Sequence, residues 1–113
     1  MTLQRLEKSD WTALCEALTP ELLGKWAEIE VASREFGVQV ETRWLPVMRV
    51  TYDPRDDLLE IMLDGLDHMV VHPRQFYVDL GSAGIESLGI VDEAGTWQIV
   101  SLRDPLMLPP PRM

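Results

Sequence analysis

Cysteine and lysine are scarce in this sequence. Cys15 is the one cysteine, so no disulfide can form within the chain and no zinc site can be built from several thiolates. Lys8 and Lys25 are the only lysines, and 10 basic residues stand against 19 acidic ones, which gives a net charge of −9. Because nucleic acids and anionic membranes are bound through cationic side chains, we expect binding to neither. The single cysteine also favours a reducing compartment.

Long apolar segments are absent as well. No apolar run approaches the ~18 residues that a membrane-spanning helix needs, so we expect no membrane association. Residues 1–8 include Arg5, Glu7 and Lys8 among isolated apolar residues, which is unlike the continuous apolar region of a signal peptide. The sequence therefore predicts a cytoplasmic protein.

The composition that remains is typical of one globular domain. The chain has 113 residues, of which 46% are hydrophobic and 26% charged, enough for one independent core. It contains no internal repeat and no linker. We predict a single domain over residues 1–113, with a helical head at residues 9–24, a β body at residues 26–103 and an extended proline-rich tail at residues 104–113.

The helical head is predicted from apolar residues that recur at helical spacing. Four of them share one helix face and predict a helix at about residues 10–18: Trp11, Leu14, Cys15 and Leu18. Thr19-Pro20 then fits the cap and first position of a second, shorter helix that ends at Gly24.

From residue 26 onward the apolar residues alternate with polar ones. The alternating segments predict strands near residues 26–32, 38–44, 48–52, 59–63, 66–72, 75–80, 85–91 and 96–102. Pro46 separates the second from the third, and Asp64-Gly65 fits a tight hairpin turn. The expected fold class is α+β: a short N-terminal helical segment packed on a curled, mostly antiparallel β-sheet of about seven or eight strands.

Two further expectations concern apolar side chains. The tail is expected to cross the surface as a strap anchored by Leu106, Met107 and Leu108, because Pro109-Pro110-Pro111 continues neither a helix nor a strand ladder. Most aromatic residues are in phase with the apolar positions of their segments, which favours the core over a ligand-stacking surface. These residues are Trp11, Trp26, Trp44, Tyr52, Phe76 and Trp97.

Acidic residues concentrate in one segment, residues 53–67. Six carboxylates there are opposed only by Arg55, and we consider them as an interaction surface: Asp53, Asp56, Asp57, Glu60, Asp64 and Asp67. Such a surface would accelerate association with a basic partner. The alternative is a solvated face that keeps the protein soluble. A hard-cation loop at Asp53, Asp56 and Asp57 is disfavoured, because the spacing does not match an EF-hand, and an Asp before Pro fits a turn in which its side chain accepts a backbone N–H.

His68 and His72 stand four residues apart, a spacing that binds zinc on a helix. The valines between them and the following proline favour a strand instead. Positions four apart on a strand are separated by about 13 Å, too far for two imidazoles to share one ion. We therefore expect no metal or other cofactor, and two histidines on one sheet face with their polar tips near its edge.

Acid/base chemistry has only weak candidates: Asp57, Asp67, His68 and His72. Asp67 and His68 are adjacent on a predicted strand and point to opposite faces, which argues against a direct dyad. Cys15 lies on the apolar face of the first helix, where a thiol is usually inert. If the fold brings at least three of the four candidates into one cleft, the enzyme hypothesis gains; if they scatter over both sheet faces, it loses.

One stretch resembles a known pattern. Residues 50–61, Val-Thr-Tyr-Asp-Pro-Arg-Asp-Asp-Leu-Leu-Glu-Ile, place Tyr-Asp-Pro before an acidic turn and an alternating strand. Together with Leu66-Asp67-His68, His72-Pro73, residues 84–88 and residues 102–106, nearly the whole chain resembles an uncharacterised family of small bacterial proteins of unknown function. The resemblance implies a single-domain, non-secreted bacterial protein and no particular reaction, cofactor or catalytic residue.

The hypothesis favoured by these observations is a non-enzymatic protein-binding or adaptor domain, with a protein partner or a second copy of itself in a homodimer. The alternative is a small hydrolase or isomerase that uses the Asp and His residues of the central strands. A third possibility, an acidic inhibitor that mimics nucleic acid, would need carboxylates spaced like phosphates along one edge.

Overall fold

The computed structural model describes residues 2–105. It contains one α-helix, one 3₁₀ turn and eight strands: β1 (Thr2–Arg5), η1 (Lys8–Asp10), α1 (Trp11–Leu22), β2 (Trp26–Ser33), β3 (Gly37–Asp53), β4 (Leu58–Leu63), β5 (Leu66–Val71), β6 (Pro73–Gly81), β7 (Gly84–Asp92) and β8 (Trp97–Arg103). The strands form one antiparallel sheet in the order β1-β6-β7-β8-β2-β3-β4-β5. The predicted α+β class is confirmed.

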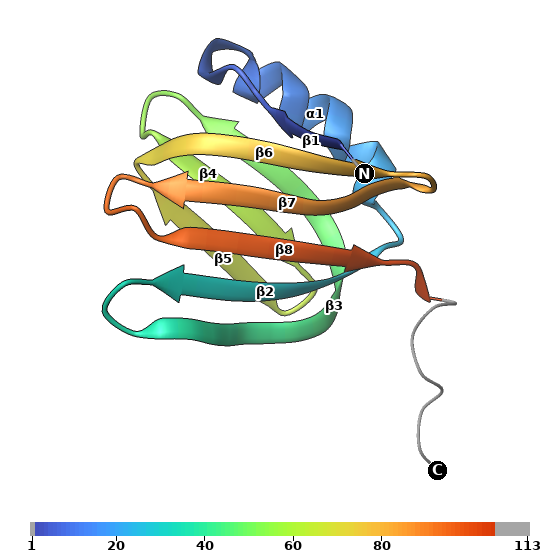
Figure 1. Cartoon of the computed structure of the whole chain (residues 1–113). Helices are drawn as coiled ribbons and strands as arrows, with labels where there is room; N and C mark the ends of the chain where they lie inside the picture. The colour runs from blue at the N-terminus through green and yellow to red at the C-terminus, as the bar shows by residue number, and fades with distance from the viewer. Residues whose placement is uncertain (1, 106–113) are drawn as a thin grey trace.

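β3 is the strand around which the sheet bends. Residues 37–46 pair with β2, whereas residues 47–53 pair with β4. The register shifts along both pairings, and Trp44 has a left-handed φ of 50° just before the change of partner. Such irregularities let one strand leave one layer and enter another. In Figure 1, β4 and β5 accordingly lie behind β6, β7 and β8.

The prediction that Pro46 separates two strands is wrong. Pro46 lies inside β3 opposite Trp26, and its carbonyl accepts the Asp64 N–H at 2.9 Å. Proline removes a donor from a strand ladder, so it is tolerated where the ladder is already interrupted. The bend of β3 is such a place, because Val47, the next residue, donates its N–H to the Lys25 carbonyl at 2.9 Å and begins the pairing with β4.

The core lies between the two layers. The first layer contains β1, β6, β7, β8, β2 and the first half of β3; the second contains the rest of β3, β4 and β5. Each layer contributes fully buried side chains, with Ile29, Phe76, Leu88, Ile90 and Val100 from the first and Val50, Leu59, Ile61 and Val70 from the second. Burial of such side chains is the main favourable contribution to folding.

A single helix closes one end of the core. Trp11, Cys15 and Leu22 are buried along its inner face. Of the four residues predicted for this face, Trp11 and Cys15 are buried and Leu14 and Leu18 are partly buried. The predicted break before Pro20 is wrong, because α1 continues through it. The Thr19 hydroxyl does not cap a new helix. It donates to the Cys15 carbonyl at 2.9 Å and accepts the Val50 N–H at 3.2 Å, which fixes the helix to β3.

The first strand was missed by the sequence analysis. β1 pairs with β6 in register from Thr2 opposite Leu80 to Arg5 opposite Tyr77. Its four residues are all exposed and show no apolar alternation, so the local sequence carries no strand signal. The β structure therefore begins before the helical head, and not at residue 26 as predicted.

The expected tail anchors Leu106, Met107 and Leu108 lie outside the described residues. No helix among residues 2–105 is long and apolar enough to cross a membrane.

The aromatic residues divide between core and surface. Trp11, Tyr52 and Phe76 are buried, and the Trp11 ring meets the other two edge-on at 5.1 and 5.8 Å. Trp97, by contrast, is 39% exposed, which corrects the prediction of a core position. It stacks on Tyr77 on the outward face of the first layer, with ring centroids 5.6 Å apart.

Replacing Trp11 with Phe is expected to lower the free energy of unfolding by about 1–2 kcal/mol, because the indole N–H that donates to the Leu6 carbonyl at 3.0 Å is lost with part of the buried ring. Urea denaturation followed by circular dichroism measures the change. Trp97→Phe is the matched control, with an expected change within about 0.5 kcal/mol. Equal losses in both variants would contradict the assignment of Trp11 to the centre of the core.

Candidate functional site

The densest group of polar contacts surrounds the carboxylate of Asp57. This residue ends the turn between β3 and β4. The Tyr52 hydroxyl donates to Oδ1 at 2.6 Å, the Lys8 ammonium lies 3.0 Å from the same oxygen, and His72 Nδ1 lies 3.3 Å from Oδ2. The His72 N–H also donates to the Asp57 carbonyl at 2.9 Å. We call Lys8, Tyr52, Asp57 and His72 the Asp57 cluster.

The backbone of the cluster is strained at two positions. Asp57 and His72 have left-handed φ values of 48° and 54°. A left-handed residue with a side chain costs roughly 1–2 kcal/mol, although Asp is better tolerated there than most residues. The side-chain and backbone bonds between the two residues offset this cost and hold both turns in place.

Two groups of the cluster, Asp57 and Tyr52, have shifted pKa values. The Tyr52 hydroxyl, followed by Lys8 and His72, lowers the pKa of Asp57 to about 2, against an opposing effect of partial burial. Burial, together with the Asp57 carboxylate, raises the pKa of Tyr52 to about 12. Asp57 therefore stays ionised and Tyr52 stays protonated, so neither group exchanges a proton at neutral pH.

The surroundings of the cluster indicate a structural junction. Lys8 also donates to the Pro73 carbonyl at 2.9 Å and lies 5.2 Å from the centre of the Trp11 ring. The cluster thereby joins the segment before α1, the end of β3 and the corner between β5 and β6. The His72 imidazole is more than half exposed. Four hollows, at the hairpin of β2 and β3, beside Leu102, at the turn between β4 and β5 and beside Leu80, are each lined by residues outside the cluster.

The four proposed acid/base residues do not all come together in one place. Asp57 and His72 lie together, whereas Asp67 points outward from the second layer and His68 points into the core. This brings together two of the four, short of the three in one cleft at which the enzyme hypothesis would gain. The prediction that the two histidines share one sheet face is wrong, because β5 ends at Val71 and His72 turns away in its left-handed conformation.

His68 has a partner that the sequence analysis did not identify. Its Nδ1 lies 2.5 Å from Glu41 Oε2, which links β5 of the second layer to the first half of β3, and its buried Nε2 has no hydrogen-bond partner among the described residues.

The predicted turn chemistry at Asp53 is confirmed, because its side chain accepts the Arg55 N–H at 2.9 Å. Among residues 2–105, no group of three or more His, Cys, Asp or Glu side chains is placed to hold a metal ion.

The outward side of the second layer combines carboxylates with exposed apolar side chains. The register places nine residues on this surface, which we call the acidic face: Arg49, Thr51, Asp53, Leu58, Glu60, Met62, Asp67, Met69 and Val71. Met69 and Val71 are 56% and 58% exposed. Burial and the neighbouring Asp67 carboxyl raise the pKa of Glu60.

The six predicted interaction residues are therefore separated by the fold. Asp53, Glu60 and Asp67 belong to the acidic face, and Asp64 lines an open groove of about 540 Å³ at one end of it. Asp56 and Asp57 lie instead in the turn between β3 and β4, where Asp57 is engaged by its cluster.

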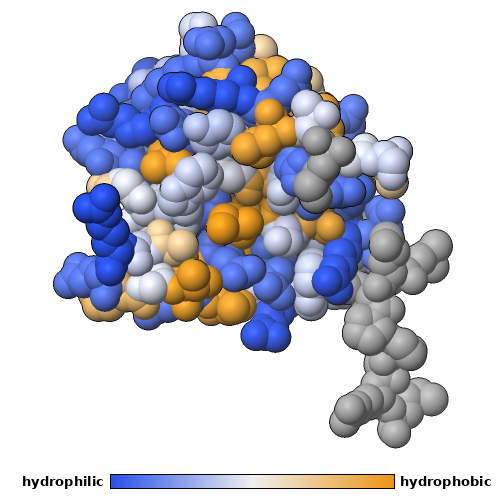
Figure 2. All heavy atoms as spheres, in the orientation of Figure 1, coloured by the Kyte–Doolittle hydropathy of each residue, from blue (hydrophilic) through white to orange (hydrophobic). Residues whose placement is uncertain are grey.

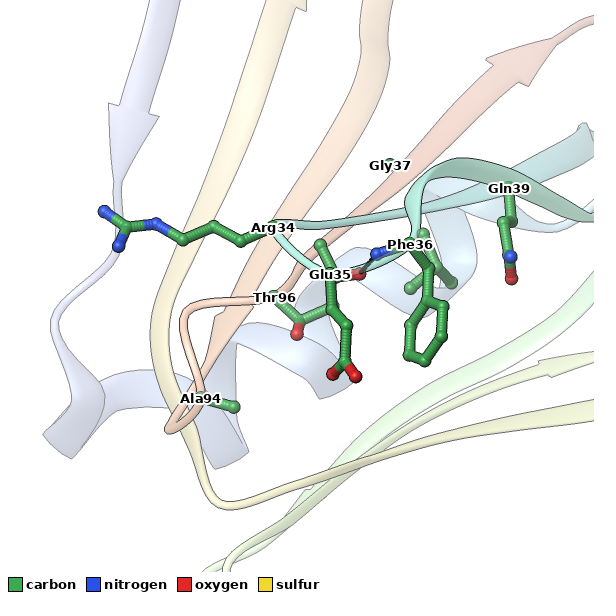
Figure 3. A pocket seen from close by; sticks show the side chains of 9 residues that line it. Arg34, Glu35, Phe36, Gly37, Gln39, Ala94 and Thr96 are labelled. Atoms are coloured by element: carbon green, nitrogen blue, oxygen red, sulfur yellow. Dashed lines mark hydrogen bonds between the residues drawn. The ribbon is translucent and has the colours of Figure 1, made fainter.

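A second exposed surface lies at the hairpin of β2 and β3. Phe36, Val38 and Val40 are 69%, 64% and 42% exposed, although the alternation of residues 38–44 predicts a dry face there. Val40 lies opposite Glu30 in β2, on the outward side of the first layer, which no other described element covers. Figure 2 shows apolar residues among polar ones across this side. Behind the hairpin, Glu35 and Phe36 line a pocket of about 360 Å³ (Figure 3).

Asp57→Asn is expected to lower the free energy of unfolding by about 2 kcal/mol at neutral pH. Asparagine keeps the shape of the side chain and tolerates the left-handed backbone, but it lacks the negative charge that accepts the Tyr52 hydrogen bond and pairs with Lys8. The lowered pKa makes the Asp57 contribution complete above pH 4 and lost as the pH falls through about 2. The difference between wild type and variant should therefore vanish over this range in urea titrations at successive pH values.

Asp56→Asn is the matched control, since Asp56 is exposed on the same turn, and its expected change is within about 0.5 kcal/mol. A pH-independent difference between wild type and Asp57→Asn would contradict the role assigned to the Asp57 charge.

Comparison with known proteins gives relatives without an assigned activity. The family model described as "Family of unknown function (DUF5335)" matches residues 2–111. An uncharacterised protein of Aquifex aeolicus (strain VF5) is 31% identical over 110 residues, which covers 96% of this chain and 99% of that protein. No solved structure matches the sequence.

Proposed function

The chain belongs to the DUF5335 family of unknown function, and from its geometry we propose that it is a non-enzymatic protein-binding domain whose docking surface is the acidic face. One observation carries the proposal: Met69 and Val71 are more than half exposed on the same surface as Glu60 and Asp67. Exposed apolar side chains that gather beside one sign of charge are typical of interaction sites.

The charges and the apolar side chains of the acidic face indicate which kind of partner would bind there. Asp53, Glu60 and Asp67 share the surface with Arg49, whose Nη2 lies 3.5 Å from the Met62 sulfur. Arg55 in the adjoining turn lies 3.8 Å from Asp53, and neither Glu60 nor Asp67 has an ion-pair partner within 4 Å among the described residues. Methionine side chains adapt to different apolar shapes. A cationic group placed between Glu60 and Asp67 would relieve their mutual repulsion. The fitting partner is therefore a basic amphipathic segment of another protein.

The free edge of β5 adjoins this surface. β5 pairs with β4 on one side and, among the described residues, with no strand on the other. A partner segment that adds to this edge would gain backbone hydrogen bonds and place its side chains beside Met69 and Val71.

The proposal includes homodimerisation at a different surface, since two acidic faces would repel each other. We place this role in the cytoplasm, where the buried free thiol of Cys15, with its pKa raised to about 12 by burial, stays reduced.

Binding of an amphipathic Lys/Leu peptide tests the proposal. Wild type should bind it with amide shift changes in β4 and β5 in NMR spectra, and with an affinity that falls as salt is added. Glu60→Gln/Asp67→Asn should weaken binding roughly tenfold, as expected for two lost ion pairs in a partly desolvated surface. Met69→Ala/Val71→Ala should weaken it by a similar factor.

The control variant Glu28→Gln/Glu30→Gln removes the same charge from β2 in the first layer and should bind the peptide like wild type. A Ser/Leu peptide without cations should not bind. The proposal fails if both charge variants weaken binding equally, because only net charge would then matter, or if the shift changes lie outside the second layer.

A further inference from the structure

Two adjoining hollows lie where the chain leaves its last strand. They share the lining residues Lys25, Ala83 and Ile85, and have volumes of about 320 and 400 Å³. The first hollow extends to Leu102 at the end of β8, and the second extends to Leu80 at the end of β6. We call the two hollows together the β8-end groove. In Figure 1, the end of β8, the turn between β6 and β7 and the connection from α1 to β2 all lie on the right-hand side of the molecule.

Apolar side chains line the groove at the margin of the core. Ile85 and Leu102 are core residues that reach the surface here, with 6% and 8% of their areas exposed. Leu80 pairs with Ile85 in the sheet and is partly buried against the same core. Leu23, which precedes the lining residue Lys25 by two positions, is 53% exposed. An apolar segment that filled this groove would remove apolar surface from water.

An ion pair ties the end of the described chain to this groove. Arg103 is the last residue of β8, and the carboxylate of Asp104 lies 3.4 Å from the Lys25 ammonium. The Lys25 side chain is 17% exposed, so this contact is partly shielded from water. The chain is thus attached to the connection between α1 and β2 just before residue 106.

The residues that follow match the apolar lining. Residues 106–108 are Leu-Met-Leu, and no charged residue occurs between Asp104 and Arg112. Proline stands at position 105 and again at positions 109–111, and its restricted backbone lowers the conformational entropy that docking removes. Four residues span at most about 14 Å, so Leu106 cannot lie far from Leu102, which lines the groove.

We propose that residues 106–108 dock in the β8-end groove of their own chain and pack Leu106 and Leu108 against Ile85 and Leu102. A segment attached at the rim of its site has a high effective concentration there, so weak apolar contacts suffice to hold it. The family model extends past this segment, to residue 111. The docked segment would cover the margin of the core between the end of β8 and the turn between β6 and β7.

The attachment favours this occupant over others. A second copy would have to bring its own tail from solution, without the advantage of the tether. The groove is formed mainly by β6, β7 and β8 of the first layer, whereas the acidic face belongs to the second. The docking therefore goes beyond the proposed binding of a basic segment and can fail or succeed independently of it.

Methyl NMR of the full chain tests the docking directly. Nuclear Overhauser contacts should join the methyl groups of Leu106 and Leu108 to those of Ile85 and Leu102. In Leu106→Ser/Leu108→Ser the methyl signals of Ile85 and Leu102 should shift, because the apolar groups packed against them are gone. Met113→Ser removes an apolar side chain from the same tail beyond the prolines, and as the matched control it should leave these signals unchanged.

Thiol reactivity gives a second measurement. Ala83→Cys introduces a thiol at an exposed position of the groove. Adding Leu106→Ser/Leu108→Ser should raise its rate of reaction with iodoacetamide roughly tenfold, if an undocked population of about 10% is what reacts in the presence of the native tail. Ala94→Cys, at the exposed turn between β7 and β8, is the matched control, and the serine substitutions should leave its rate unchanged.

Three results would overturn the proposal. The first is a lack of contacts between the methyl groups of the tail and those of the groove, and the second is equal reactivity of Ala83→Cys with both tails. The third is contacts that arise only between differently labelled copies in a mixture, since the occupant would then be the tail of a second copy. Binding of the Lys/Leu peptide by Leu106→Ser/Leu108→Ser should equal that of wild type, which separates this test from that of the acidic face.

Discussion

The carboxylate of Asp57 holds together segments that are far apart in the sequence. The polypeptide passes between its two layers twice, once along β3 and once at the corner between β5 and β6. Tyr52 stands near the end of the first passage, His72 at the second, and both meet Asp57, as does Lys8 ahead of the helix. Because the helix packs on β3 beside this point, one charged group contacts the segment before the helix and both places where the chain passes between the layers.

The sequence predicted well what local patterns determine. Alternation located β4, β5 and the hairpin of β7 and β8, and helical spacing identified Trp11 and Cys15 as buried. It failed where distant segments decide the outcome. β1 forms a strand because its backbone pairs with β6, and Pro46 lies within a strand because the sheet bends there. Neither reason can be found in the residues nearby.

The candidate site shows the same division. Asp57 and His72 stood out by residue type, but their contact, and the participation of Tyr52 and Lys8, follow from how two turns meet in space. Likewise, the valines of residues 38–40 fit a buried strand by pattern, yet they face outward, because a register shift in the pairing with β2 places Val40 opposite the outward Glu30. The two layers consequently expose surfaces of different chemistry: the outward side of the second layer is acidic beside Met69 and Val71, and the hairpin of the first layer exposes Phe36, Val38 and Val40.

The pairing of β1 with β6 has a consequence for the order of folding. Thr2 and Leu80 are neighbours in the sheet although the helix and strands β2 to β5 separate them in the chain. Contacts of such long range require the loop between them to close first, which makes them slow to form. During synthesis the first strand must therefore wait, unpaired, until β6 has left the ribosome. β1, an edge strand, is therefore the first strand of this sheet to be synthesised and among the last to form its native pairing.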